Sequence, residues 1–362
     1  MLRYLEIKSQ LLEITDRMQP GEKLMNRCTL CKMLDTTRTT LDKAIRELVD
    51  QGVLVSRKGS GTFLSGGLIT PQKGIKNWCV IVPNFENVYA RLVSGIESEA
   101  RRRDVNVILC CSDDNFSRQE HLIHRLIASG ADGFIIVPVI TDSPQENLKL
   151  YSQLVNMTIP FVFCNRGIEG INVPVVSSND SYGSYIATKL LITRGYRKIG
   201  FIASRKYVTS IQRCHGYMSA LQEAGIQIDR RLIFFPPSAV AVDYTGHVKR
   251  MIEKEEADGF FCFNYSVGAD VAGTVEKCGK KVSDDIGIIA YDNGGPNDSG
   301  GAALSTVGSR AGEIGAKAAQ VLGRIISGDE PKSDFDGYLF KPEITDRQSC
   351  RGKKSPTGGP VL

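Results

Sequence analysis

The first part of the chain carries the clearest pattern of apolar and polar positions. Four apolar residues recur at helical spacing after Arg38 and predict a helix with one buried face: Leu41, Ile45, Leu48 and Val49. Alternating residues then predict two short strands, 53–55 and 62–64, joined by a basic turn. Two earlier helical patterns, Leu5 to Ile14 and Thr29 to Leu34, complete a unit of three helices and a hairpin.

The polar face of the third helix and the basic turn point to a nucleic-acid partner. The residues on that face are mostly able to donate hydrogen bonds: Arg38, Thr39, Asp42, Lys43 and Arg46. A helix of this kind fits the major groove of DNA, and a hairpin beside it can reach an adjacent phosphate or groove edge. The pattern therefore predicts a winged helix-turn-helix over residues 1–66, with double-stranded DNA as its partner.

From residue 78 the pattern changes to alternating strands and helices. The predicted strands are short and apolar on both faces: Trp78–Pro83, Val105–Cys111, Gly133–Val139, Pro160–Cys164, Lys198–Ala203, Leu232–Phe235, Gly259–Phe263 and Ile286–Tyr291. The predicted helices lie between them: Tyr89–Arg103, Ser117–Ser129, Gln145–Asn156, Tyr182–Arg194, Ile211–Ala224, His247–Glu255 and Val267–Cys278. Strands apolar on both faces indicate parallel sheets covered by helices. Because eight units exceed one ordinary sheet, we expect an α/β fold of two doubly wound lobes, with a ligand in the cleft between them.

Composition narrows the class of protein. The chain has 362 residues with 42% apolar and 23% charged residues, which is typical of a globular protein. Its net charge of +5 is mild, but residues 1–67 hold eleven Lys and Arg against eight Asp and Glu. No signal peptide or apolar run long enough for a membrane span is evident, so we expect a cytoplasmic protein. Ten scattered cysteines suit a reducing compartment, and the Cys28–Cys31 pair lacks the partners of a zinc site; no metal or cofactor is expected.

The strings TRTTLDKAIRELVDQGVL and RKGSGTF resemble the GntR family of bacterial regulators, over about residues 1–66. The resemblance implies that Arg38 and Thr40 lie at the DNA and that Lys58 and Gly59 form the wing tip. Cys28 stands where the family has a DNA-contacting arginine, and Asp42 stands where an arginine is common. The whole set expected to bind DNA is Arg27, Arg38, Thr39, Thr40, Lys43, Arg57, Lys58 and Gly59.

Residues 78–350 resemble the sugar-sensing domain of LacI/GalR regulators, which is related to type I periplasmic binding proteins. The strings that carry the likeness include IPFVFCNR, VSSNDSYGSYIATKLLITRGYRKIGFIA, SIQRCHGYMSALQEAGI, DGFFCFN and VSDDIGIIAYDN. The expected domains are a head over 1–66, a linker over 67–77, a two-lobed domain over 78–350 and a disordered tail over 351–362. Within the two-lobed domain, we expect the first lobe over about 78–176 and 307–328. The second lobe is expected over about 177–306 and 329–350.

Eight residues at strand ends and helix starts are candidates for binding a sugar. Asp292 ends a strand, where its carboxylate can accept hydrogen bonds from two hydroxyls or instead cap a turn. The resemblance implies that Arg213, in its R-x-x-G-Y motif, contacts sugar. Arg166 can reach the cleft or form a structural salt bridge, and aromatic residues after the first strand can stack on the ring or belong to the core. The full set is Phe85, Tyr89, Asp113 (or its neighbour Asp114), Arg166, Arg213, Asn264, Asp292 and Ser309.

Together these features predict a homodimeric, DNA-binding transcriptional regulator of the AraR-like kind, most simply a repressor, whose operator affinity a small sugar controls. Analogy with such hybrids suggests a pentose or deoxyhexose. Two alternatives are a sugar-binding protein without a DNA role and an enzyme on the same scaffold. The sequence shows no nucleophile-elbow or phosphate-loop motif, so we expect no enzymatic activity.

Overall fold

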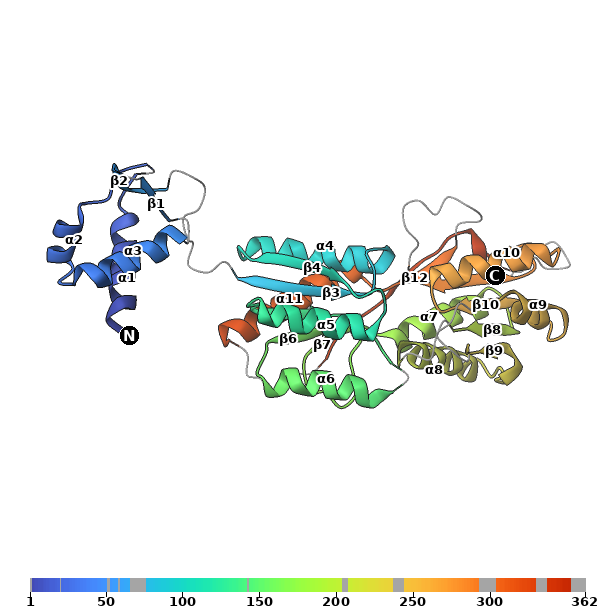
Figure 1. Ribbon diagram of the computed structural model, residues 1–362. Helices are drawn as coiled ribbons and strands as arrows, with labels where there is room; N and C mark the ends of the chain where they lie inside the picture. Colours follow the sequence, from blue (N-terminus) through green and yellow to red (C-terminus); the bar gives the residue numbers. More distant parts are fainter. Residues whose placement is uncertain are drawn as a thin grey trace. The chain divides into compact units, whose positions relative to one another are not determined.

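The computed structural model describes residues 2–19, 21–50, 53–57, 59–65, 76–141, 143–203, 208–236, 244–292, 304–329 and 337–352 (Figure 1). It divides into two compact units, Met1–Ile75 and Lys76–Leu362. The expected linker over 67–77 and tail over 351–362 lie largely outside the described residues. Within the described ranges, every helix is too short or too polar to cross a membrane.

The first unit consists of three helices followed by a hairpin, as the apolar pattern predicts. The helices are α1 (Leu2–Thr15), α2 (Arg27–Met33) and α3 (Arg38–Asp50), and strands β1 (Leu54–Arg57) and β2 (Gly61–Leu64) pair antiparallel. Their apolar faces meet in one core, in which four leucines are fully buried: Leu11, Leu30, Leu41 and Leu48. Because one face of α3 packs into this core, its opposite face lies at the surface.

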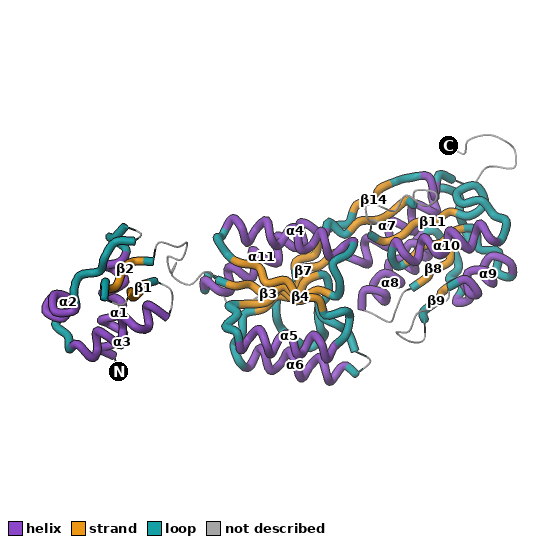
Figure 2. The backbone as a smooth tube through the Cα atoms, turned by 45° about the horizontal axis from the view of Figure 1, so that its top comes forward, coloured by secondary structure: helices purple, strands orange, loops and turns teal. Residues whose placement is uncertain are grey.

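The first lobe of the second unit is a six-stranded parallel sheet in the order β13-β7-β6-β5-β3-β4 (Figure 2). Its early elements are β3 (Asn77–Val82), α4 (Asn87–Arg102), β4 (Asn106–Cys111), α5 (Phe116–Ala128), β5 (Gly133–Ile136), α6 (Pro144–Asn156), β6 (Phe161–Cys164) and β7 (Val175–Ser178). Helices α4 and α11 (Ala311–Ser327) cover one face, and α5 and α6 cover the other.

The second lobe repeats this design with sheet order β14-β12-β11-β10-β8-β9, parallel except for β14. Its elements are α7 (Asp180–Thr193), β8 (Ile199–Ile202), α8 (Val208–Glu223), β9 (Ile233–Phe234), α9 (Thr245–Glu253), β10 (Gly259–Cys262), α10 (Tyr265–Lys277), β11 (Gly287–Tyr291), β12 (Ser305–Gly308) and β14 (Glu343–Thr345). Helices α7 and α8 pack on one face, and α9 and α10 on the other. The predicted fold class of doubly wound parallel sheets is confirmed.

One predicted lobe boundary is wrong. The range 329–350 was expected in the second lobe, yet β13 (Tyr338–Phe340) pairs with β7 in the sheet of the first lobe. Tyr338 and Phe340 pack against that lobe's core, and β13 covers the edge that β7 would otherwise expose. The chain therefore passes between the lobes after β7, after β12 and again between β13 and β14.

Glycine backbones set the close approach of α4 and α11. A Cβ atom added to Gly315 would lie 2.0 Å from the carbonyl oxygen of Leu92, and one on Gly95 would lie 1.9 Å from that of Gly312. We expect Gly315→Ala to lower the unfolding free energy of the second unit by about 3 kcal/mol, since the backbones of α4 and α11 would have to move apart. Urea unfolding measures this.

The matched control is Gly273→Ala on α10, where an added Cβ meets no atom within 4 Å. This substitution should stabilise by up to about 1 kcal/mol, because alanine favours a helix over glycine. Equal effects of the two alanines would contradict the packing account.

Candidate functional site

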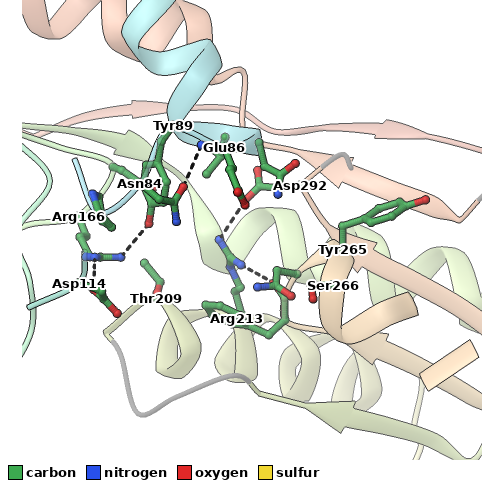
Figure 3. A pocket seen from close by; sticks show the side chains of 16 residues that line it. Asn84, Glu86, Tyr89, Asp114, Arg166, Thr209, Arg213, Tyr265, Ser266 and Asp292 are labelled. Carbon is green, nitrogen blue, oxygen red and sulfur yellow. Dashed lines mark hydrogen bonds and ion pairs between the residues drawn. The ribbon is translucent and has the colours of Figure 1, made fainter. Parts of the chain in front are cut away.

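A cavity of about 290 Å³ lies between the two lobes of the second unit (Figure 3). It sits beyond the carboxyl ends of β3, β4, β6, β10 and β11, where parallel α/β sheets bind ligands. The first lobe contributes Pro83, Asn84, Glu86, Asn87, Val88, Tyr89, Asp114, Asn165 and Arg166 to its lining. The second lobe contributes Thr209, Arg213, Phe263, Asn264, Tyr265, Ser266 and Asp292.

Arg213 is the most firmly held side chain of this cavity. It projects from α8, is 6% exposed, and donates from Nε to Oδ1 of Asp180 at 2.7 Å. Its guanidinium lies 3.5 Å from the ring centre of Tyr291 and 4.5 Å from that of Phe263. Burial alone would lower the pKa of Arg213, but Asp180 and Tyr291 outweigh it and the pKa is raised. Arg213 therefore stays charged and fixed.

Burial also acts on the groups that hold Arg213. It raises the pKa of the Asp180 carboxyl, against the opposing charge of Arg213, and it raises the pKa of the Tyr291 phenol well above its usual range. The Tyr291 hydroxyl shares a hydrogen bond of 2.9 Å with the Ser178 hydroxyl, which ends β7 of the other lobe. This network therefore joins the cavity to a point where the chain passes between the lobes.

Asp292 faces Arg213 across a short gap. Its Oδ2 lies 3.9 Å from Nη2 of Arg213, too far for a direct hydrogen bond, so both groups can take a ligand hydroxyl between them. Its Oδ1 accepts from the backbone N–H of Ser309 at 3.3 Å. The Asp292 carboxylate thus lines the cavity and also binds the backbone of the segment that follows β12.

Arg166 provides the matching donor from the first lobe. It is 8% exposed, and its Nε donates to the carbonyl of Pro138 at 2.8 Å. One Nη atom donates to the Tyr89 hydroxyl at 3.4 Å, and the other lies 3.7 Å from Asp114 (Figure 3). The sequence left open whether Arg166 reaches the cleft or forms a structural salt bridge. In the structure it does both, since it lines the cavity and pairs with Asp114.

Asn264 likewise combines two roles. Its Oδ1 accepts from the backbone N–H of Val267 at 2.9 Å and so caps α10. The residue still lines the cavity, where its side-chain amide can donate to a ligand. Of the eight predicted sugar-binding residues, the structure gathers five around one space: Tyr89, Arg166, Arg213, Asn264 and Asp292.

The other three predicted residues do not line this cavity. Phe85 is half-exposed and absent from the lining, so neither stacking in this cavity nor a place in the core describes it. Asp113 pairs with Arg118 at 3.1 Å, and its neighbour Asp114 takes the place in the lining. Both aspartates have left-handed φ values, 52° and 53°, and this turn directs successive side chains apart. Ser309 lines a neighbouring cavity and reaches Asp292 only through its backbone.

Sequence reasoning missed Thr209, which lies four residues before Arg213 on α8 and therefore on the same face. It is 6% exposed, and no hydrogen-bond partner reaches its hydroxyl among the residues that the structure describes. The helical spacing from Arg213 is the signal that could have found it. Glu86, Tyr265 and Ser266, at the starts of α4 and α10, were also missed.

Four of the eight residues expected to bind DNA lie on α3 of the first unit. Arg38 and Thr39 are exposed in its first turn, and the Thr40 hydroxyl shares a 2.9 Å hydrogen bond with Thr37. Lys43 Nζ lies 4.7 Å from the ring centre of Tyr4 on α1. These four residues therefore lie on the same helix, α3.

The hairpin and α2 supply the rest of the predicted set. Arg57 is exposed at the end of β1, with its guanidinium 5.1 Å from the ring centre of Phe63. Gly59 has a φ of 77°, which the tight turn requires, while Lys58 lies outside the described residues. Arg27 is held by Asp42 and Thr62.

Three family models match the chain. Residues 4–64 match the bacterial regulatory proteins of the gntR family. Residues 76–236 match the periplasmic binding proteins and sugar binding domain of the LacI family, and residues 188–350 match the periplasmic binding protein-like domain. The chain joins a GntR-type helix-turn-helix domain to a LacI-type domain. The cavity lies in the LacI-type domain, and the exposed face of α3 lies in the GntR-type domain.

Two relatives align with this chain along most of their length. The arabinose metabolism transcriptional repressor of Geobacillus stearothermophilus is 23% identical, over 96% of this chain and 98% of that protein. The repressor of the same name from Halalkalibacterium halodurans is 24% identical, over 98% and 96%. Among solved structures, transcription regulator CcpA of Lactococcus lactis aligns with a TM-score of 0.66 and 25% identity, over 76% of this chain and all of that chain.

Proposed function

We propose that this protein is a transcriptional repressor whose affinity for operator DNA is controlled by a sugar bound between the lobes of its LacI-type domain. The observation that carries this proposal is the pairing of a surface-exposed α3 with a cavity that holds Arg166, Arg213 and Asp292. The relatives named as arabinose metabolism repressors support both halves. A DNA-binding regulator of this kind acts in the cytoplasm.

The cavity suits a neutral monosaccharide better than an anion. Each of its arginines already faces carboxylates, Arg166 facing Asp114 and Arg213 facing Asp180 and Asp292. Its volume of about 290 Å³ is at the small end for ligand pockets, which suits one sugar ring. A pentose such as arabinose is the first candidate.

Sugar binding would act on DNA through the closure of the lobes. A ligand that contacts Arg166 on one lobe and Asp292 on the other favours the closed state by its differential affinity for that state. We propose that the protein binds as a homodimer, because one small DNA-binding module buries too little surface for high specificity. Closure would change how the two heads fit their half-sites.

Asp292→Asn tests the sugar site. The neutral amide loses charge-assisted hydrogen bonds to ligand hydroxyls, so arabinose affinity should fall by roughly 10- to 100-fold. Operator binding without sugar should stay unchanged. Isothermal titration calorimetry measures the first quantity, and fluorescence anisotropy of labelled DNA measures the second.

The control is Asp270→Asn, which removes an exposed carboxylate of the same lobe outside the cavity. It should leave both affinities unchanged. If Asp292→Asn weakened DNA binding and spared sugar binding, the proposed division between the two domains would be wrong.

A further inference from the structure

On the exposed face of α3, the acidic residue Asp42 lies beside the basic Arg38. Asp42 follows Arg38 by four residues, so the two side chains project from the same face of the helix. The Asp42 side chain is 42% exposed, and that of Arg38 is 76% exposed. A carboxylate on a surface that approaches DNA phosphates is repelled unless it meets a donor there. The presence of Asp42 on this face therefore needs an explanation.

The two oxygens of Asp42 have different surroundings. Oδ1 accepts a hydrogen bond of 3.2 Å from Nε of Arg27 on α2, and Nη1 of Arg27 also donates to the Thr62 hydroxyl on β2 at 2.9 Å. Arg27 thereby links the recognition helix to the hairpin. Oδ2 lies 3.8 Å from Nε of Arg38, beyond hydrogen-bond distance, and within the described part of the chain this oxygen keeps its capacity to accept.

The major groove offers only two kinds of amino donor. Cytosine presents only the donor N4–H₂. Adenine presents the donor N6–H₂ beside the acceptor N7, which would repel a carboxylate. An aspartate accepts from cytosine, and an asparagine pairs with adenine through one donor and one acceptor. The unused Oδ2 of Asp42 matches cytosine.

We propose that Asp42 is a specificity-determining residue that accepts a hydrogen bond from the amino group of a cytosine in the operator. Arg27 is then a positioning residue that anchors the other carboxylate oxygen and does not itself read a base. This inference rests on the proposed DNA-binding function. Arg38, four residues and about 6 Å earlier on the helix, is placed to donate to a guanine within about two base pairs of that cytosine.

Selection from a random library of double-stranded DNA tests this inference with the full-length protein. Wild type should enrich a motif with a cytosine whose replacement weakens binding about tenfold. In Asp42→Asn the amide oxygen still accepts from Arg27, so the amide N–H₂ faces the groove, and the preferred base at that position should change from cytosine to one that presents an acceptor, such as guanine or thymine. Asp42→Ala should remove the preference there while it retains the rest of the motif. Far-ultraviolet circular dichroism confirms that each variant is folded.

The matched control is Glu47→Gln on the same helix. Glu47 pairs with Lys8 of α1 at 3.3 Å, so it points away from Arg38 and Asp42, and its variant should enrich the wild-type motif. Arg27→Met should weaken discrimination at the same cytosine without a change of the preferred base. Discrimination at that cytosine equal to wild type in Arg27→Met would overturn the positioning role.

Two other results would overturn the role of Asp42. One is an Asp42→Asn motif that keeps the cytosine preferred by wild type. The other is loss of the guanine preference alone, which would mean that Asp42 only orients Arg38. By contrast, failure of wild type to enrich any sequence would contradict the proposed DNA-binding function itself, so the two failures are distinguishable.

Discussion

Arg213→Ala should lower the unfolding free energy of the second unit by about 3–5 kcal/mol and abolish sugar binding. The reason is that Asp180, 2% exposed, would lose the guanidinium that donates to it at 2.7 Å and would remain as a buried, unpaired carboxylate. The loss of packing against Tyr291 adds to this cost. Urea unfolding followed by circular dichroism measures the stability, and calorimetry measures the sugar affinity.

A double variant separates the two effects. In Arg213→Met with Asp180→Asn, no charge is left buried, so most of the lost stability should return while sugar binding stays absent. Two results would contradict this account of the site. One is a double variant as unstable as Arg213→Ala, and the other is sugar binding restored in the double variant.

Arg38→Ala should abolish specific DNA binding and leave sugar affinity unchanged. Arg38 is exposed in the first turn of α3, and a good arginine contact to guanine contributes about 1–3 kcal/mol of discrimination. With two heads in a dimer, operator affinity should fall by at least about 30-fold. Anisotropy of a labelled operator, titrated at fixed salt, measures the loss.

The control for lost charge is Arg101→Ala, which removes an exposed arginine of α4 in the second unit. It should leave operator affinity within about twofold of wild type, since a single remote charge is screened. A comparable loss in Arg101→Ala would show that overall charge, and not the face of α3, governs binding.

The sequence predicted most of the helices and the strongly apolar strands, and it missed α11 and four short strands. Each predicted helix from Tyr89–Arg103 to Val267–Cys278 has a counterpart among α4 to α10, because burial imposes a strong apolar period. Strands β7, β12, β13 and β14 were missed, because each has polar residues or only three residues in place of the continuous apolar runs of the predicted strands. Helix α11 was not among the predicted helices, although residues 307–328 were expected in the first lobe.

The candidate site was predictable where it depends on strand ends. Asp292, Asn264 and Arg166 directly follow or closely follow apolar strands, and the fold brings such positions together at one edge. The choice between Asp113 and Asp114 depends on a left-handed turn that no residue pattern revealed. The contact between Arg213 and Asp180 joins different helices, so only the fold could show it.

The most direct test of the central claim is the affinity of the full-length protein for its selected DNA, measured with and without saturating sugar. Arabinose is the first ligand, followed by a panel of other pentoses and hexoses. We predict that one of these sugars weakens DNA binding by at least about fivefold, the lower end of ordinary allosteric coupling. A DNA affinity that no sugar in the panel changes would contradict the account.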